Sequence, residues 1–214
     1  MTSLKNFPIG TAIIGVLFML VILTTYLLVK PPPPPAELQG VMLNEFRQMQ
    51  AFDLVSSKNG RFTNSNLQGK WSFVFFGYTS CPDICPATLY VLDQVNSLLQ
   101  EDADIKADNI QFAFISVDPG RDTLKKLDDY AGYFNKGFIA VTGMPDEIKA
   151  FSGQFGAGYI IEPETAPGLY NVIHTAAIFL VDPFGRPVAS FSQPHYSRTI
   201  YSQFRKIRGY FSGN

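Results

Sequence analysis

Two cysteines, the only ones in the chain, stand four residues apart in the stretch Cys81-Pro82-Asp83-Ile84-Cys85-Pro86. They follow the apolar run Trp71 to Phe76, which is typical of a buried strand, and precede helically spaced apolar residues from Ala87 to Leu99. Ligands in open α/β sheets gather at the carboxyl ends of the strands, so this position favours function. Amide groups at a helix N-terminus favour thiolates, and we therefore predict that both sulfurs are suited to metal or disulfide chemistry.

The prolines around the cysteines shape this turn. Pro82 suits a first helical position, whereas Pro86 lacks a backbone donor and pushes Cys85 away from helical geometry. The first turn of the helix is therefore predicted to be bent or restarted.

His174 is the third candidate for this chemistry. It directly precedes the run Ala176 to Val181, predicted as a strand antiparallel to the cysteine-bearing one, so it should meet the cysteines at one sheet edge. Two thiolates and an imidazole suit Cu(I) and accommodate Cu(II), whereas zinc normally takes a fourth ligand, and none is identified here. A plain disulfide is the alternative for the cysteines, and its stabilisation would be small because the closed loop is short.

Two further polar residues lie near predicted strand ends. Asp118 follows the apolar run Ile110 to Val117 and is predicted either to form a turn or to support the ligands from behind. His195 follows Gln193-Pro194 and is predicted to be a surface residue.

The order of elements predicts a thioredoxin-like α/β domain. The cysteine-bearing strand, its helix and the strand Ile110 to Val117 form a βαβ unit, whose strands should be parallel. The segment Glu37 to Gln50 is either a short helix or irregular, and Gly156 to Asn171 is predicted to be a long loop beside the site. The remaining predictions are hairpins over Phe52 to Thr63 and Ala176 to Phe191, and helices over Thr123 to Phe134, Thr142 to Phe155 and Ser197 to Arg208.

The N-terminal part differs from the rest. No charge occurs from Ile9 to Val29, and Lys5 and Lys30 flank this run, which is long enough to cross a hydrocarbon core. A cleaved signal peptide is the alternative, but five prolines follow directly in place of a cleavage site. We predict a membrane anchor over 1–30, a proline-rich linker over 31–36 and one domain over 37–214. The formal net charge of −1 gives no indication of nucleic-acid binding.

Three fragments occur in this order: Phe76-Gly77-Tyr78-Thr79 with the cysteine stretch, Asp118-Pro119-Gly120-Arg121-Asp122-Thr123, and His174-Thr175 ahead of Leu180-Val181-Asp182-Pro183. With them the chain resembles the SCO/SenC family of membrane-anchored, thioredoxin-like copper proteins. The resemblance implies that Cys81, Cys85 and His174 bind copper received from a donor protein. It also implies delivery to the binuclear copper centre of cytochrome c oxidase, with the domain on the extracytoplasmic (periplasmic) side. One departure is Ile173, where the family usually has an acidic residue.

Two other functions are compatible with a thioredoxin-like fold. A thiol-disulfide oxidoreductase could use Cys81 and Cys85 to keep the oxidase's copper-ligand cysteines reduced, although such enzymes usually have C-x-x-C spacing. A thiol peroxidase would need an activating cation beside its cysteine, and Thr79-Ser80-Cys81 brings none within the motif. Copper delivery is therefore the preferred interpretation.

Overall fold

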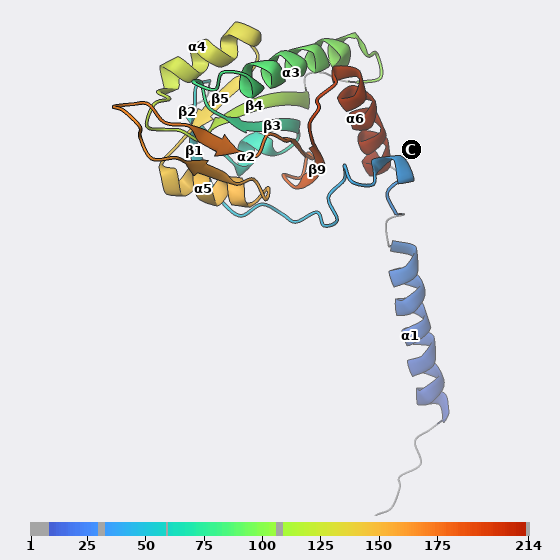
Figure 1. Cartoon of the computed structure of the whole chain (residues 1–214). Helices are drawn as coiled ribbons and strands as arrows, with labels where there is room; N and C mark the ends of the chain where they lie inside the picture. Colours follow the sequence, from blue (N-terminus) through green and yellow to red (C-terminus); the bar gives the residue numbers. More distant parts are fainter. Residues whose placement is uncertain (1–8, 30–32, 59, 106–108, 213–214) are drawn as a thin grey trace, which may run out of the picture. The chain divides into compact units, whose positions relative to one another are not determined.

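The N-terminal helix and the domain are separate units of the chain. The computed structural model describes residues 9–29, 33–58, 60–105 and 109–212, and the contacts divide the chain into Met1–Pro35 and Ala36–Asn214 (Figure 1). Helix α1 (Ile9–Val29) covers the uncharged run, with side chains described over residues 10–25. Lys5, Lys30 and the first two prolines of the predicted linker, Pro31 and Pro32, lie outside the described residues. Among the described residues, none of the helices combines the length and the apolarity needed to cross a membrane. The membrane anchor therefore stays a prediction.

The domain is built on a mixed seven-stranded sheet. The cysteine-bearing strand β3 lies near its middle, and all seven of its residues are buried. Across the sheet the order is β2 (Gly60–Thr63), β1 (Asp53–Ser56), β5 (Ile139–Thr142), β4 (Ile110–Ser116), β3 (Trp71–Gly77), β8 (Ile178–Val181) and β9 (Pro187–Phe191).

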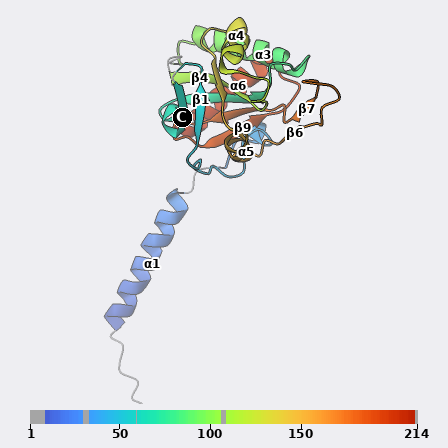
Figure 2. The same ribbon diagram turned by 90° about the vertical axis from the view of Figure 1, so that its left-hand side faces the viewer.

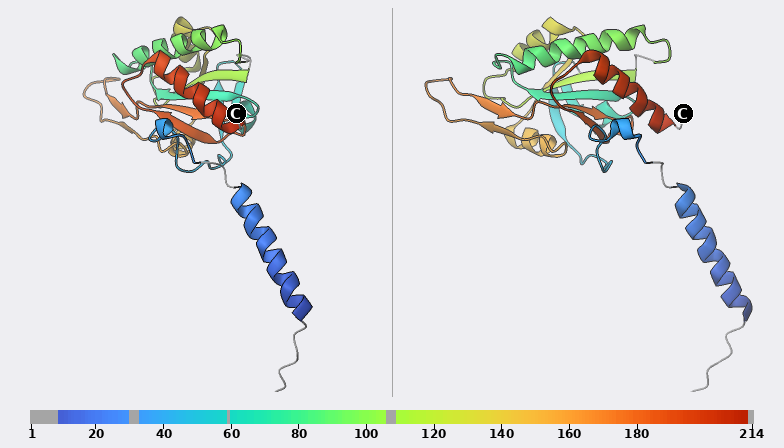
Figure 3. Two further views of the ribbon diagram at one scale, coloured as in Figure 1. Left: turned by 90° about the vertical axis from the view of Figure 1, so that its right-hand side faces the viewer. Right: turned by 45° about the vertical axis from the view of Figure 1, so that its right-hand side comes forward.

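Helices pack on both faces of this sheet (Figures 2 and 3). Along β3, Phe73 contacts Phe204 of α6, whereas Phe76, on the opposite face, contacts Phe151 of α5. Each fully buried ring contributes about 1.5–3 kcal/mol relative to exposure, so β3 is held firmly from both sides. The helical elements of the domain are η1 (Ala36–Leu38), α2 (Asn64–Leu67), α3 (Ile84–Glu101), α4 (Leu124–Phe134), α5 (Pro145–Gly153) and α6 (Ser197–Ser212).

The predicted strand–helix–strand unit is present. β3 and β4 pair in parallel, with Gly77 opposite Ser116, and β8 runs antiparallel to β3, with Ile178 opposite Phe75. The cysteine loop and the turn after β4 therefore leave the sheet at the same edge. The hairpin over Phe52 to Thr63 is also observed as β1 and β2, although Asn59 at its tip lies outside the described residues. The segment Glu37 to Gln50, predicted as a short helix or irregular chain, is mainly irregular. Only its first residues belong to a helix, the short η1.

The predicted long loop is partly wrong. Residues 156–171 include β6 (Tyr159–Ile161), which pairs antiparallel with β7 (Val172–His174) to form a separate two-stranded sheet. We call residues 159–174 the β6–β7 ribbon. Its strands are three residues long and Gly and Pro lie between them, so the sequence shows too little alternation to indicate strands. The ribbon matters because His174 is its last residue.

Candidate metal centre

The two cysteines occupy different environments at the end of β3. Cys81 is half-buried in the loop, whereas Cys85 is fully buried in the first turn of α3. Of the two predicted alternatives for the first turn, a restart at Pro86 is not observed, because α3 begins at Ile84 and runs through Pro86. Pro86 is tolerated there because the first N–H groups of a helix have no intrahelical acceptor.

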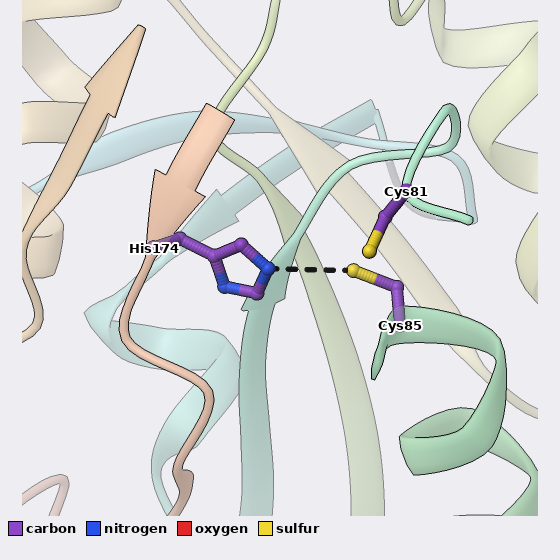
Figure 4. A group of neighbouring side chains, drawn as sticks. All are labelled: Cys81, Cys85 and His174. Carbon is purple, nitrogen blue, oxygen red and sulfur yellow. Dashed lines mark hydrogen bonds between the residues drawn. The ribbon is translucent and has the colours of Figure 1, made fainter. Parts of the chain in front are cut away.

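His174 approaches the cysteines from the β6–β7 ribbon (Figure 4). Its Nδ1 lies 3.2 Å from the carbonyl oxygen of Thr175, and since a carbonyl only accepts, Nδ1–H is the donor. In the neutral ring the lone pair is then on Nε2, which makes a hydrogen-bonding contact of 3.6 Å with Sγ of Cys85. The rings of Phe75 and Tyr78 flank the imidazole edge to face, with centroids 6.1 and 5.8 Å away.

These three residues form a compact donor set. One donor atom from each of Cys81, Cys85 and His174 lies within 4.8 Å of the other two, and within the described part of the chain no further Cys, His, Asp or Glu joins the group. Bonds of about 2.3 Å to sulfur and 2.0 Å to nitrogen, as in zinc sites, would let one ion join donors up to about 4.3 Å apart. The 3.6 Å between Nε2 and the Cys85 sulfur fits such a shared ion. Two sulfurs and one imidazole suit copper better than four-coordinate zinc.

The sulfurs differ in charge, which the sequence did not indicate. A hydrogen bond from the Cys85 thiol, opposed by burial and assisted by backbone N–H groups of Cys85 and Asp83, lowers the pKa of Cys81 to about 4. The same hydrogen bond, together with burial, raises the pKa of Cys85 far above its ordinary value. The prediction that the helix N-terminus favours both thiolates therefore applies to Cys81 alone. At neutral pH the pair is one thiolate and one thiol.

This asymmetry predicts selective alkylation at low pH. Because the pKa of Cys81 is about 4, its thiolate persists well below pH 7, and iodoacetamide at pH 6 should modify Cys81 first. Protonation should slow that reaction only as the pH falls towards 4. Peptide mass spectrometry over pH 3–9 measures both rates, with the denatured chain as control, where both thiols should react only near pH 8.5. Equal rates at the two cysteines would contradict the assigned charges.

Asp118 lies behind the site and contacts none of the three donors. It is buried, accepts a hydrogen bond of 2.6 Å from the Tyr170 hydroxyl, and pairs with Arg121 at 2.5 Å. Asp118 closes the turn, since its carbonyl oxygen accepts the N–H groups of Arg121 and Asp122, and its support of the ligands stays a prediction.

Asp122 was missed by the sequence analysis. Its buried carboxylate accepts hydrogen bonds from the N–H and hydroxyl of Thr79 and from Ser116 Oγ, the first at 3.0 Å and the last at 2.8 Å. Thr79 stands two residues before Cys81, so Asp122 holds the cysteine loop against the end of β4. No spacing signal relates residues 79 and 122, which meet only through the βαβ fold.

His195 is only partly exposed, and its ring makes contacts that the sequence did not indicate. Its Nε2–H donates to the carbonyl oxygen of Phe191 at 3.1 Å, and Nδ1 lies 3.3 Å from the Thr88 hydroxyl on α3. Burial lowers the pKa of His195. With both ring nitrogens engaged, this half-buried histidine joins α3 to the end of β9 and lies outside the donor set.

Comparison with known proteins agrees with this geometry. Residues 42–209 match the sequence profile of the SCO1/SenC family. The mitochondrial SCO1 homolog 1 of Arabidopsis thaliana is 35% identical over 62% of this chain, although the match spans only 38% of that protein. An SCO2-like protein of Rickettsia prowazekii is 32% identical over 72% of this chain and 74% of its own length.

A solved structure shares the fold. The crystal structure of Arabidopsis thaliana ScoI with copper bound superposes with a TM-score of 0.68 at 31% identity, covering 74% of this chain and 97% of that one. The likeness confirms the predicted thioredoxin-like α/β fold of the domain. Together with the profile match over residues 42–209, it shows that this chain belongs to the SCO1/SenC family.

Proposed function

We propose that this protein is a copper chaperone that supplies the binuclear copper centre of cytochrome c oxidase during assembly. The observation that carries the proposal is the convergence of Cys81, Cys85 and His174 within 4.8 Å. The copper-bound relative supports copper as the cargo, and family membership supports the oxidase subunit as the acceptor and another copper protein as the donor.

The three donor residues have different roles when copper binds. Cys81 offers a half-exposed thiolate, and the tautomer of His174 places the lone pair on Nε2, in contact with the Cys85 sulfur. Cys85 must lose its proton as copper binds, because the thiolate is the ligand form, so loading releases a proton from this buried thiol. A disulfide between the cysteines would remove both anionic sulfurs. Loading must therefore follow reduction of the pair.

We also propose that α1 anchors the domain to a membrane, with the domain on the periplasmic side. The uncharged run from Ile9 to Val29 and its flanking lysines support this proposal. The full chain should sediment with membranes and resist extraction by carbonate. Recovery in the supernatant, or a mature N-terminus after residue 30, would refute the anchor.

A thiol-disulfide oxidoreductase is the second candidate. It is favoured by the depressed pKa of Cys81 and by the buried thiol of Cys85 beside it, which resemble an attacking and a resolving cysteine. Such an enzyme would keep the oxidase's copper-ligand cysteines reduced. Thiol-disulfide exchange needs no imidazole ligand. Copper delivery should therefore depend on His174, whereas disulfide reduction should not.

Replacing His174 with alanine should separate these functions. Copper affinity should fall more than about tenfold, the size of effect seen when metal sites lose supporting groups, while disulfide reduction by the metal-free dithiol persists. The decisive assay follows copper spectroscopically from the loaded full chain, in detergent, to a pre-reduced soluble oxidase copper domain. His195→Ala removes the other histidine of the sequence and should leave transfer intact. Failure of the wild type to transfer copper to this competent acceptor would favour the oxidoreductase.

A further inference from the structure

Arg121 fastens the β6–β7 ribbon to the turn that follows β4. Its Nη1 donates to the carbonyl oxygen of Tyr170 at 2.8 Å, and its Nε donates to Asp118 at 2.5 Å. The Tyr170 hydroxyl donates to the other oxygen of the same carboxylate at 2.6 Å. Asp118 is fully buried, so these charge-assisted bonds have little competition from water. We call these contacts of Arg121, Asp118 and Tyr170 the clamp. Tyr170 stands four residues before His174, so the clamp holds the strand that ends in the histidine.

The same guanidinium lies between the two chain segments that carry the donor atoms. Its carbon is 3.6 Å from the ring centroid of Tyr170 and 5.6 Å from that of Tyr78. The ring of Tyr78 meets the imidazole of His174 at an interplanar angle of 89°, and Tyr78 stands three residues before Cys81. Arg121 thus lies close both to a ring of the cysteine segment and to a ring of the histidine segment.

The details of these contacts indicate a positioning role beyond general stability. Nη2 of Arg121 is buried, and no residue in the described part of the chain hydrogen-bonds it. An unpaired buried N–H opposes folding, so this part of the guanidinium adds nothing to stability. What arginine provides here is a planar face for two rings together with donors in a fixed fork. A lysine provides neither.

We propose that Arg121 is a positioning residue that sets the place of His174 relative to the two cysteines. This inference rests on the proposed copper function and refines it. The imidazole is the donor that accommodates Cu(II), whereas two thiolates are the donors that Cu(I) prefers. Loss of the clamp therefore weakens Cu(II) binding more than Cu(I) binding.

The test is a double-mutant cycle on the full-length chain in detergent, with Arg121→Lys, His174→Ala and the double variant. Cu(II) affinity should fall about tenfold on Arg121→Lys, as for other residues that orient metal ligands, and should show no further fall when His174 is already alanine. The matched control is Arg186→Lys. Arg186 pairs with the buried Asp182 and lies 5.0 Å from the ring centroid of Phe184, outside the donor set. The Arg186→Lys variant should leave Cu(II) affinity unchanged.

A second measurement uses the metal-free protein, so it is independent of the copper proposal. The nuclear Overhauser contact between the rings of His174 and Tyr78 should be present in the wild type and in Arg186→Lys, and lost in Arg121→Lys. Failure of the wild type to bind copper would refute the proposed function, and this contact would still decide the role of Arg121. An equal loss of affinity in both His174 backgrounds, or an unchanged ring contact in Arg121→Lys, would overturn the inference.

Discussion

Replacing either Cys81 or Cys85 with serine should abolish copper loading. A serine hydroxyl stays protonated at neutral pH and is a hard oxygen donor, whereas Cu(I) selects soft thiolates. We expect the affinity to fall by more than about a hundredfold, beyond the range found for losses in the outer shell of metal sites. Anaerobic competition with a Cu(I) chelator measures this change.

The matched control for the cysteine variants is Ser80→Ala. Ser80 is exposed in the same loop, and the contact recorded for its hydroxyl is with Lys126 at 3.5 Å. This variant should load copper like the wild type. The unfolding free energy must be measured for Cys85→Ser, because that side chain is fully buried. Copper affinity unchanged in either folded cysteine variant would rule that cysteine out as a ligand.

Replacing Gly77 with alanine should have the second largest effect. A Cβ at this last residue of β3 would lie 2.7 Å from Sγ of Cys85 and 2.8 Å from the ring of Phe114. Both neighbours are buried, so the added methyl must displace them, and overpacking of this kind costs about 1–3 kcal/mol. Since the sulfur moves while both thiols remain, copper affinity should fall at least about tenfold with the thiol count unchanged.

Gly153→Ala is the control for added volume. Gly153 ends α5, and a Cβ there meets no atom within 4 Å. Copper titration and denaturant unfolding of the two alanine variants separate crowding of the sulfur from any general effect of the substitution. Wild-type copper affinity in a folded Gly77→Ala protein would show that the position of the Cys85 sulfur does not matter.

Much of the central fold could be predicted from local sequence. The runs Trp71 to Phe76 and Ile110 to Val117 are continuous and apolar because β3 and most of β4 are buried on both faces. An intervening helix leaves few options other than parallel pairing. The meeting of His174 with the cysteines was also inferred, from the antiparallel direction of β8. It is observed although the histidine lies on a different sheet.

Other features depend on contacts between distant residues, which a single sequence does not show. The ribbon pairs Tyr159 with His174 through very short strands, and Ile173 faces solvent opposite Ile160. The charge difference between the sulfurs arises because the thiol of Cys85 donates to Cys81 inside a buried site. Likewise, the surroundings of His195 are set by the packing of α3 against β9.

The strands that position the donor atoms differ in how many neighbouring strands they pair with. This difference has a consequence for the order in which the donors release copper. The cysteines follow β3, which pairs with β4 over residues 71–77 and with β8 over residues 72–75, whereas β7 pairs within the described chain with β6 alone. Regions with fewer buried contacts open at lower free energy, so amides of the ribbon should exchange with solvent before those of β3. In the proposed copper delivery the nitrogen should therefore detach first and the sulfurs last. An incoming thiolate would then take the vacated coordination position, and copper would pass between proteins without ever being released into water.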